Sequence, residues 1–257
     1  MIELKSGREL ELMRRAGHIL ADVVDALRTV VRPGVSTLEL DEEVETFIRT
    51  RGATPAFKGY RGFPATVCVS LNEEVVHGIP SAHRRLKEGD IVGLDLGCIV
   101  EGYYADRAFT LPVGDIPPRV QALLDVTRQS LELAVEHCRA GRRLSDISHA
   151  VQRHVEGGGF AVVRAFVGHG IGRALHEDPQ IPNFGDPGRG PVLRPGMVLA
   201  VEPMVTMGSW EVRILDDGWT AVTRDGSLAA HFEHTIAVTD GDPEVLTSRT
   251  GRAAEAA

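Results

Sequence analysis

An internal repeat constrains the fold of this chain more than any other feature, because residues of the first half recur 107 positions later. The matching pairs combine turn glycines with polar and apolar helix positions: Arg32 and Arg139, Gly34 and Gly141, Glu39 and Asp146, Leu40 and Ile147, Val44 and Val151, Ile48 and Val155, Gly52 and Gly159. The same shift aligns residues 86–95 (LKEGDIVGLD) with residues 193–202 (LRPGMVLAVE), so that Asp95 meets Glu202. One shift that fits two separated stretches indicates an ancient duplication, with two halves about a pseudo-two-fold axis.

Helix signals agree with this repeat. Capping-box patterns begin at Ser6 and Ser36, and apolar residues at helical spacing follow each of them. We expect helices over 6–32 and 36–51 in the first half, and over 118–138 and 145–155 in the second. Strands and loops should fill the second half to about Val238. We expect one domain over residues 1–243, with halves of about 1–112 and 113–243, and a flexible tail over residues 244–257.

The stretch DIVGLDLGCIVEGYYAD, residues 90–106, predicts a strand, a turn at Glu101-Gly102 and a second strand. Alternation along the strands puts Asp95 on the face opposite its leucine neighbours, and a hairpin brings it within a residue or two of facing Asp106. Facing carboxylates repel each other unless a cation or a shared proton lies between them. Taken alone, the stretch is equally consistent with solvated acids at a polar strand edge.

Further chemistry-bearing residues stand in or beside apolar strand-like segments of the second half. They are His169 and His176 in FVGHGIGRALHEDPQIPNF, Glu202 in VLAVEPMV, and Glu233 in HFEHTIAV. Burying a carboxylate is costly unless it is paired or bound to a metal. Four acids with one imidazole suit two divalent cations bridged by carboxylates, and jointly they favour a metal site over unrelated buried acids.

Composition and charge argue against several classes of protein. The net charge of -8 argues against general affinity for nucleic acid or an anionic membrane, and no apolar run resembles a signal peptide or a membrane span. The three cysteines, Cys68, Cys98 and Cys138, lack CxxC spacing. Their number and spacing indicate a reducing cytosol and argue against a cysteine-zinc site. We therefore expect a cytoplasmic protein.

Taken together, these motifs resemble the type I methionine aminopeptidases, which are M24-type metallopeptidases, along nearly the whole chain. The matching segments are GYRGFPATVCVSLNEEVVHGIP (59–80), DLGCIVEGYYADRAFT (95–110), GHGIGRALHEDP (168–179), VLAVEP and HFEHT. The resemblance implies an α+β pita-bread fold, with two pseudo-symmetric αβ halves around a central antiparallel sheet. Type I is expected because the C-terminal half has no long insertion and no zinc-finger extension precedes the catalytic domain.

The resemblance also implies the site. The expected ligands of two divalent ions (Co, Mn, Fe or Zn) are Asp95, Asp106, His169, Glu202 and Glu233. The expected catalytic residues are His77, His176 and Glu202. The expected substrate-binding residues are Phe57, Tyr60, Phe63, Cys68, His77, Leu175, His176 and Trp219. A bridging water would attack the first peptide bond, Glu202 would accept its proton, and His176 would hydrogen-bond the oxyanion or the scissile amide. His77 would contact the backbone of the next residue.

Three positions depart from the pattern of the resembling family. Leu175 stands where Phe is frequent, Phe57 where Cys is frequent, and Gly97 where some relatives have Thr. The first two departures put the width of the pocket in question, and the third implies that a hydroxyl next to the metal is missing. No ligand position is substituted, so an inactive protein is not indicated.

The implied activity is removal of the N-terminal methionine from nascent proteins whose second residue is small. The implied partners are the N-termini of nascent chains, with transient ribosome association and a monomeric protein. Two alternatives stay open: a prolidase or aminopeptidase P, which normally carries an extra N-terminal domain, and a non-catalytic pita-bread binding protein. Proteins of the latter class lose metal ligands, and a peptide-cleavage assay with added metal separates all three.

Overall fold

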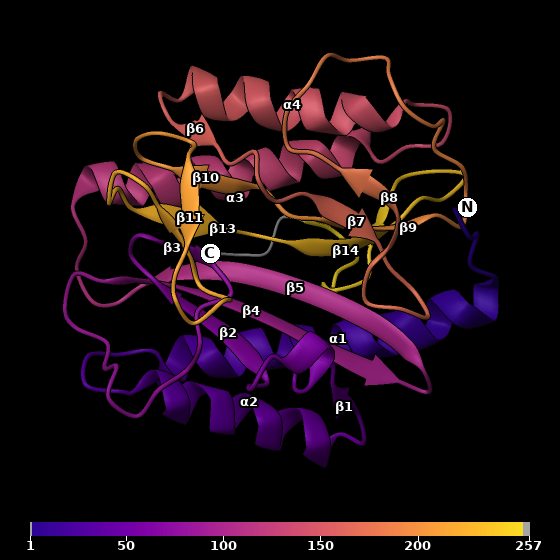
Figure 1. Ribbon diagram of the computed structural model, residues 1–257. Coiled ribbons are helices and arrows are strands. Elements are labelled where there is room, and N and C mark those ends of the chain that lie inside the picture. The colour runs from indigo at the N-terminus through magenta and orange to yellow at the C-terminus, as the bar shows by residue number, and fades with distance from the viewer. Residues whose placement is uncertain (1, 254–257) are drawn as a thin grey trace.

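The computed structural model describes residues 2–253 and shows helices packed on both sides of a layer of antiparallel strands (Figure 1). Helices α1 (Gly7–Val30) and α2 (Thr37–Thr50) cover the strands of the first half, while α3 (Pro118–His137) and α4 (Leu144–Gly157) cover those of the second half. All four expected helices are confirmed.

The first half contributes a sheet built around a long hairpin. Strand β4 (Ile91–Val100) pairs with β5 (Tyr103–Pro112), with β1 (Thr54–Pro55) and with β2 (Val67–Leu71). Both turn residues, Glu101 and Gly102, have positive φ, which matches the right-handed twist of a two-residue hairpin. A short 3-10 helix, Tyr60–Gly62, interrupts the loop between β1 and β2. The predicted hairpin is confirmed.

The second half contributes shorter strands. A five-stranded sheet has the order β15 (Glu244–Val245), β14 (His234–Ala237), β9 (Val198–Val201), β7 (Gly168–Gly170) and β8 (Glu177–Ile181). A second sheet joins β13 (Ala229–His231), β10 (Met204–Thr206) and β6 (Ala161–Val162). A third joins β11 (Val212–Ile214), β12 (Ala221–Thr223) and β3 (Glu74–Val76) of the first half. Strand β5 contacts both β13 and β14, and these contacts join the two halves.

The repeat is visible in the backbone. Helices α2 and α4 begin and end 107 residues apart, as their bounds show, and α1 and α3 end at the same spacing. The amide of Gly34 donates to Leu86 O at 2.8 Å, and 107 positions later the amide of Gly141 donates to Leu193 O at 3.0 Å. The two halves therefore share one frame of helix ends and turns, as the sequence predicts.

Each half has its own apolar core, and the first core orients the central hairpin. Leu94 and Leu96 are fully buried among side chains of α1 and α2, including Leu20 and Leu40. Because side chains alternate along a strand, Asp95 must then point away from these helices and toward the second half. Burial of large aliphatic side chains on one face thus decides where the acid on the other face points.

The expected flexible tail is wrong for its first residues. Strand β15 pairs with β14, and residues 246–248 behind it are almost completely buried. The carbonyl of Thr247 accepts a hydrogen bond from the buried Arg107 guanidinium at 2.5 Å. The segment is fixed because Leu246 fills the apolar core and Thr247 pairs its polar groups, neither of which a local turn-rich pattern reveals. Residues 254–257 of the expected tail lie outside the described residues.

Glu202 lies beside a strand rather than inside one, because the segment VLAVEPMV forms two strands with this acid between them. Strand β9 stops at Val201 and β10 begins at Met204. Pro203 has no amide to donate to a ladder, so the pairing breaks there and Glu202 sits in the gap.

Among the described helices, none combines the length and the apolar character that crossing a membrane requires.

Candidate metal centre

Two carboxylates of the centre come from the hairpin. Asp106 on β5 pairs with Gly97 of β4, two positions beyond Asp95, so both acids lie on one face as diagonal neighbours. Gly97, directly opposite Asp106, adds no side chain of its own to this face. The first half therefore presents two acids toward the second half.

Three further donors come from the second half. His169 lies on β7, Glu202 follows β9 directly, and Glu233 precedes β14 directly. Strand β9 lies between β7 and β14 and pairs with both, so the three side chains start from neighbouring strands. The Glu233 amide donates to Ala108 O of β5 at 2.8 Å, which ties this edge to the hairpin.

The donor atoms converge on one point. One ligand atom each of Asp106, His169 and Glu233 lies within 4.8 Å of the others. His169 Nε2 is 3.6 Å from Glu202 Oε1 and 3.9 Å from Asp106 Oδ2. The other ring nitrogen, Nδ1, lies 2.9 Å from Gly170 O, which indicates that Nδ1 carries the proton and Nε2 offers its lone pair to the centre. Burial lowers the pKa of His169 to about 4, so the ring is neutral and has the protonation state that a metal ligand needs.

The acids of the centre are unstable as isolated anions. Burial raises the pKa of Asp95 to about 7 and that of Glu202 to about 8. Burial and then repulsion from neighbouring acids raise the pKa of Asp106 and of Glu233 well above the usual range. Buried oxygens on Asp95, Asp106 and Glu233 have no hydrogen-bond partner. Clustered carboxylate oxygens with one neutral imidazole fit divalent cations, which would supply the missing partners and offset the repulsion.

A cavity of about 170 Å³ opens onto these acids. It brings together every site residue expected from the sequence: Phe57, Tyr60, Phe63, Cys68, His77, Asp95, Asp106, His169, Leu175, His176, Glu202, Trp219 and Glu233. Arg61, which is not among the residues expected from the sequence, also lines the cavity.

Much of the remaining cavity wall is apolar. Phe63 meets Trp219 edge-on with ring centroids 5.2 Å apart, and Leu175 is almost completely buried. Cys68 on β2 pairs with Asp95 on β4. Burial and the nearby acids raise the pKa of its thiol well above the usual range, so the thiol stays protonated and uncharged.

Phe57 and Gly97 form a matched pair. A Cβ atom at Gly97 would lie 2.8 Å from Phe57 Cε1 and 3.0 Å from Ala56 Cβ. The ring thus occupies the space that a side chain at position 97 would need. Phe57 and Gly97 look like independent departures in the sequence, but the size of one side chain limits the size of the other.

Both expected substrate-side histidines reach the cavity. His77 has φ 63, an uncommon conformation for a residue with a side chain, and burial lowers its pKa to about 4. The Tyr60 hydroxyl lies 2.8 Å from His176 Nδ1, and the two rings stack. The ring centroids of His176 and His169 are 4.3 Å apart. The His176 ring therefore stands directly beside the candidate ligand His169.

Sequence reasoning missed His231. Its Nε2 lies 3.6 Å from Glu202 Oε2, on the side of that carboxylate away from His169, and it has no hydrogen-bond partner. The ring is nearly inaccessible to solvent. Alternation within HFEHT was the available signal, because His231 stands two positions before Glu233.

Comparisons with known proteins agree with this geometry. Residues 11–240 match the model of Metallopeptidase family M24. The chain is 53% identical over 247 residues to "Methionine aminopeptidase 1" of Bacillus subtilis, covering 96% of this chain and 99% of the relative. It is 52% identical over 247 residues to "Methionine aminopeptidase" of Clostridium perfringens, with the same coverage of both chains.

Solved structures show the same likeness. The crystal structure of methionine aminopeptidase from Thermotoga maritima superposes with a TM-score of 0.96 at 49% identity, covering 97% of this chain and all of that one. Prolidase from Pyrococcus furiosus shares the fold at 22% identity, with a TM-score of 0.78 over 95% of this chain and 65% of that chain. These likenesses confirm the expected pita-bread fold. The chain therefore belongs to the metallopeptidase family M24 and, within it, to the methionine aminopeptidases.

Proposed function

We propose that this enzyme removes the N-terminal methionine from peptides whose second residue is small, using two divalent cations held by Asp95, Asp106, His169, Glu202 and Glu233. One observation carries the proposal: a single small cavity joins this donor cluster to a mostly apolar wall. The donors fit cations, and the apolar end fits one unbranched side chain.

The residues of the centre have separate tasks. When bound, divalent cations lower the pKa of water toward roughly 7 and polarise the carbonyl under attack. Glu202 is our candidate for accepting the water's proton, because its carboxylate lines the cavity beside His169. His231 Nε2 lies on the other side of that carboxylate, 3.6 Å from Glu202 Oε2.

The two substrate-side histidines would hold the peptide. With the Tyr60 hydroxyl donating to Nδ1 of His176, the proton of the neutral ring sits on Nε2. That N–H is available to the oxyanion that develops on the carbonyl, or to the scissile amide. His77 would contact the backbone of the second residue. Its ring lines the cavity and meets Trp219 edge-on, with ring centroids 6.4 Å apart.

The walls of the cavity would select the side chains of both the first and the second residue of the peptide. The flexible thioether of methionine suits the apolar end formed by Phe57, Phe63 and Trp219. His77 and His176 crowd the approach to the acids, so a large second side chain would displace the scissile carbonyl. A displacement of about 1 Å can cost on the order of 10²-fold in rate.

The observations favour the proposed activity over a prolidase and over a non-catalytic binding protein. The prolidase likeness is at 22% identity and supports the shared fold alone. Non-catalytic proteins of this fold lose metal ligands, whereas all five expected donors line the cavity here, and Asp95, Asp106 and Glu233 have buried oxygens without a hydrogen-bond partner.

The test is cleavage of short peptides by metal-free protein to which Mn, Fe, Co or Zn is added back. We expect release of methionine from Met-Ala-Ser, and roughly 10²-fold slower release from Met-Leu-Ser. An Xaa-Pro dipeptide should not be cut. Cleavage of that dipeptide without methionine release would favour a prolidase, and no cleavage with any metal would favour a binding protein.

A further inference from the structure

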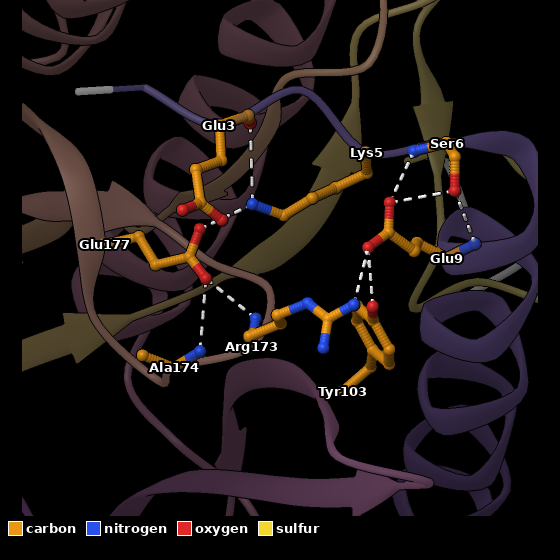
Figure 2. A network of polar contacts seen from close by, with 8 residues as sticks. All are labelled: Glu3, Lys5, Ser6, Glu9, Tyr103, Arg173, Ala174 and Glu177. Carbon is orange, nitrogen blue, oxygen red and sulfur yellow. Dashed lines mark hydrogen bonds and ion pairs between the residues drawn. The ribbon is translucent and has the colours of Figure 1, made fainter.

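The N-terminal segment crosses the loop that carries His176. We call residues 2–6 the strap and residues 172–177 the loop; Figure 2 shows the contact between them. The Lys5 amide donates to Gly196 O at 2.7 Å, which fixes the strap against the second half. The Lys5 side chain is only 4% exposed, although lysine is almost never buried without a partner.

That partner is Glu177. Lys5 Nζ lies 2.5 Å from Glu177 Oε2, and it also reaches Glu3 O at 3.4 Å. The other carboxylate oxygen, Glu177 Oε1, accepts from the amides of Arg173 at 2.7 Å and Ala174 at 3.1 Å. One carboxylate therefore connects the strap to the turn of the loop, as the dashed lines in Figure 2 show.

Gly172 makes this approach possible. A Cβ atom there would lie 2.1 Å from Lys5 Cε and 2.7 Å from Lys5 Nζ. The lysine passes directly over the glycine, whose own φ lies outside the left-handed region, so the glycine serves the close approach rather than a special turn.

A second tie comes from the first turn of α1. Glu9 Oε1 accepts from the Tyr103 hydroxyl at 2.5 Å and pairs with Arg173 Nη2 at 3.1 Å. The same Glu9 side chain caps the helix through Ser6. The loop is thus held by residues 5 and 9, more than 160 positions before it in the chain.

The loop carries residues of the cavity. Leu175 and His176 both line it, and His176 directly precedes Glu177 in the chain. We propose that Lys5 and Glu177 are positioning residues, which set His176 against the substrate by holding the loop to the strap. This inference rests on the proposed function of His176. Neither residue lines the cavity, so each would act through the loop.

The ion pair could instead add only stability, and a matched control separates the two roles. Arg14 on α1 pairs with Glu244 on β15 at 2.6 Å, so it also ties the N-terminal helix to the second half. That pair does not touch the loop. Loss of Glu244 should therefore lower stability without moving His176.

The experiment compares Lys5→Met, Glu177→Gln, Gly172→Ala and the control Glu244→Gln in the full chain. For Lys5→Met we expect kcat on Met-Ala-Ser to fall roughly 10–100-fold, with KM changed less than about threefold. Titration calorimetry should give unchanged metal affinity. In the metal-free protein, hydrogen exchange at the Arg173 and Ala174 amides should quicken by about tenfold or more.

The other variants keep the proposal open to refutation if Lys5→Met does not fold. Gly172→Ala leaves both charges in place but pushes the ammonium away, so it should reproduce the loss in kcat. Lys5→Met/Glu177→Gln should lose little more than Lys5→Met alone, because both substitutions break the same contact.

Three results would overturn the proposal: parental kcat in folded Lys5→Met, an equal loss in Glu244→Gln, or exchange at the loop amides that stays slow. If the parental protein itself does not release methionine, the proposed function fails. In that case the exchange measurement still decides whether the strap holds the loop.

Discussion

The two halves of the molecule share one backbone frame but present different chemistry to each other. Asp95 stands inside the unbroken ten-residue strand β4, whereas the equivalent Glu202 stands in the gap that Pro203 opens between β9 and β10. The regular hairpin of the first half places two acids as diagonal neighbours. The interrupted strand of the second half frees a longer acid, which reaches between His169 and His231. The helix caps and turns keep the same backbone arrangement in both halves, whereas the strand edges that face each other differ.

The helix starts show the same divergence. Ser36 and Glu39 form a reciprocal capping box on α2, with the Glu39 amide donating to Ser36 Oγ at 3.2 Å. At the equivalent start of α4, Asp146 accepts from the Arg143 amide at 3.0 Å, but an arginine side chain has no acceptor to return the bond. Half of one cap has been lost without moving the helix.

The largest expected effect tests whether both halves are needed at the centre. Asp95→Asn and Glu202→Gln should each lower turnover by at least roughly 10³-fold, because each weakens the set of charged donors. Circular dichroism should show parental folding, and metal content measured by mass spectrometry should fall for Asp95→Asn. A folded variant with near-parental turnover at saturating metal would show that its half contributes no essential ligand.

The two histidines sharpen the comparison, since His77 follows β3 of the first half and His176 belongs to the second half. We expect His176→Ala to lower kcat by roughly 10²–10⁴-fold, because it removes a donor to the developing charge. His77→Ala should mainly raise KM. Metal titrations should match the parental protein in both variants, and loss of one metal equivalent in His176→Ala would contradict the assignment.

Gly97 is the next position to test, because its equivalent in the second half is the fully buried Met204. Gly97→Thr should lower the free energy of unfolding by about 1–3 kcal/mol, since the new side chain meets the Phe57 ring. Phe57→Cys/Gly97→Thr should recover part of that loss, as measured by denaturant unfolding. Strict additivity of the two changes would mean that the ring and the glycine are not coupled.

Substitutions at the N-cap residues of α2 and α4 should lower the free energy of unfolding by unequal amounts. Ser36→Ala should cost about 1 kcal/mol of unfolding free energy, because it removes the acceptor at the start of α2. Arg143→Ala should stay within about 0.5 kcal/mol, because its side chain supplies no acceptor for the helix. Equal losses in paired urea titrations would show that the two starts are stabilised in another way.

The smallest expected effect is the pH dependence of stability that Glu9 contributes. The Tyr103 hydroxyl, and then the Ser6 cap, lower the pKa of Glu9 to about 2 from an ordinary value of 4.5. A lowered folded-state pKa means that the stabilisation is complete above pH 4.5 and is lost as pH falls toward 2. The gap in unfolding free energy between the parental protein and Glu9→Gln should therefore narrow over that range. The second half has Ile116 at the equivalent position and offers no such acid.

Local patterns made the frame predictable. The capping boxes at Ser6 and Ser36 and the turn at Glu101-Gly102 each act within a few residues, so the helix and hairpin bounds follow from them. The expected flexible tail is wrong for its first residues because burial of Leu246 depends on a core assembled from distant strands. Pro203 alone accounts for the break between β9 and β10, because it has no amide to donate to the ladder.

By itself the sequence determined the duplication, the four helices, the central hairpin and the placing of Asp95 and Asp106 on one face, because caps, turns and alternation act over short distances. Only the tertiary structure decided what lies against them: His231 beside Glu202, Phe57 over Gly97, and Lys5 over Gly172. Each of these contacts joins segments that are far apart in the chain. They depend on how two cores pack and how much space one glycine leaves, and no local pattern of residues records either quantity.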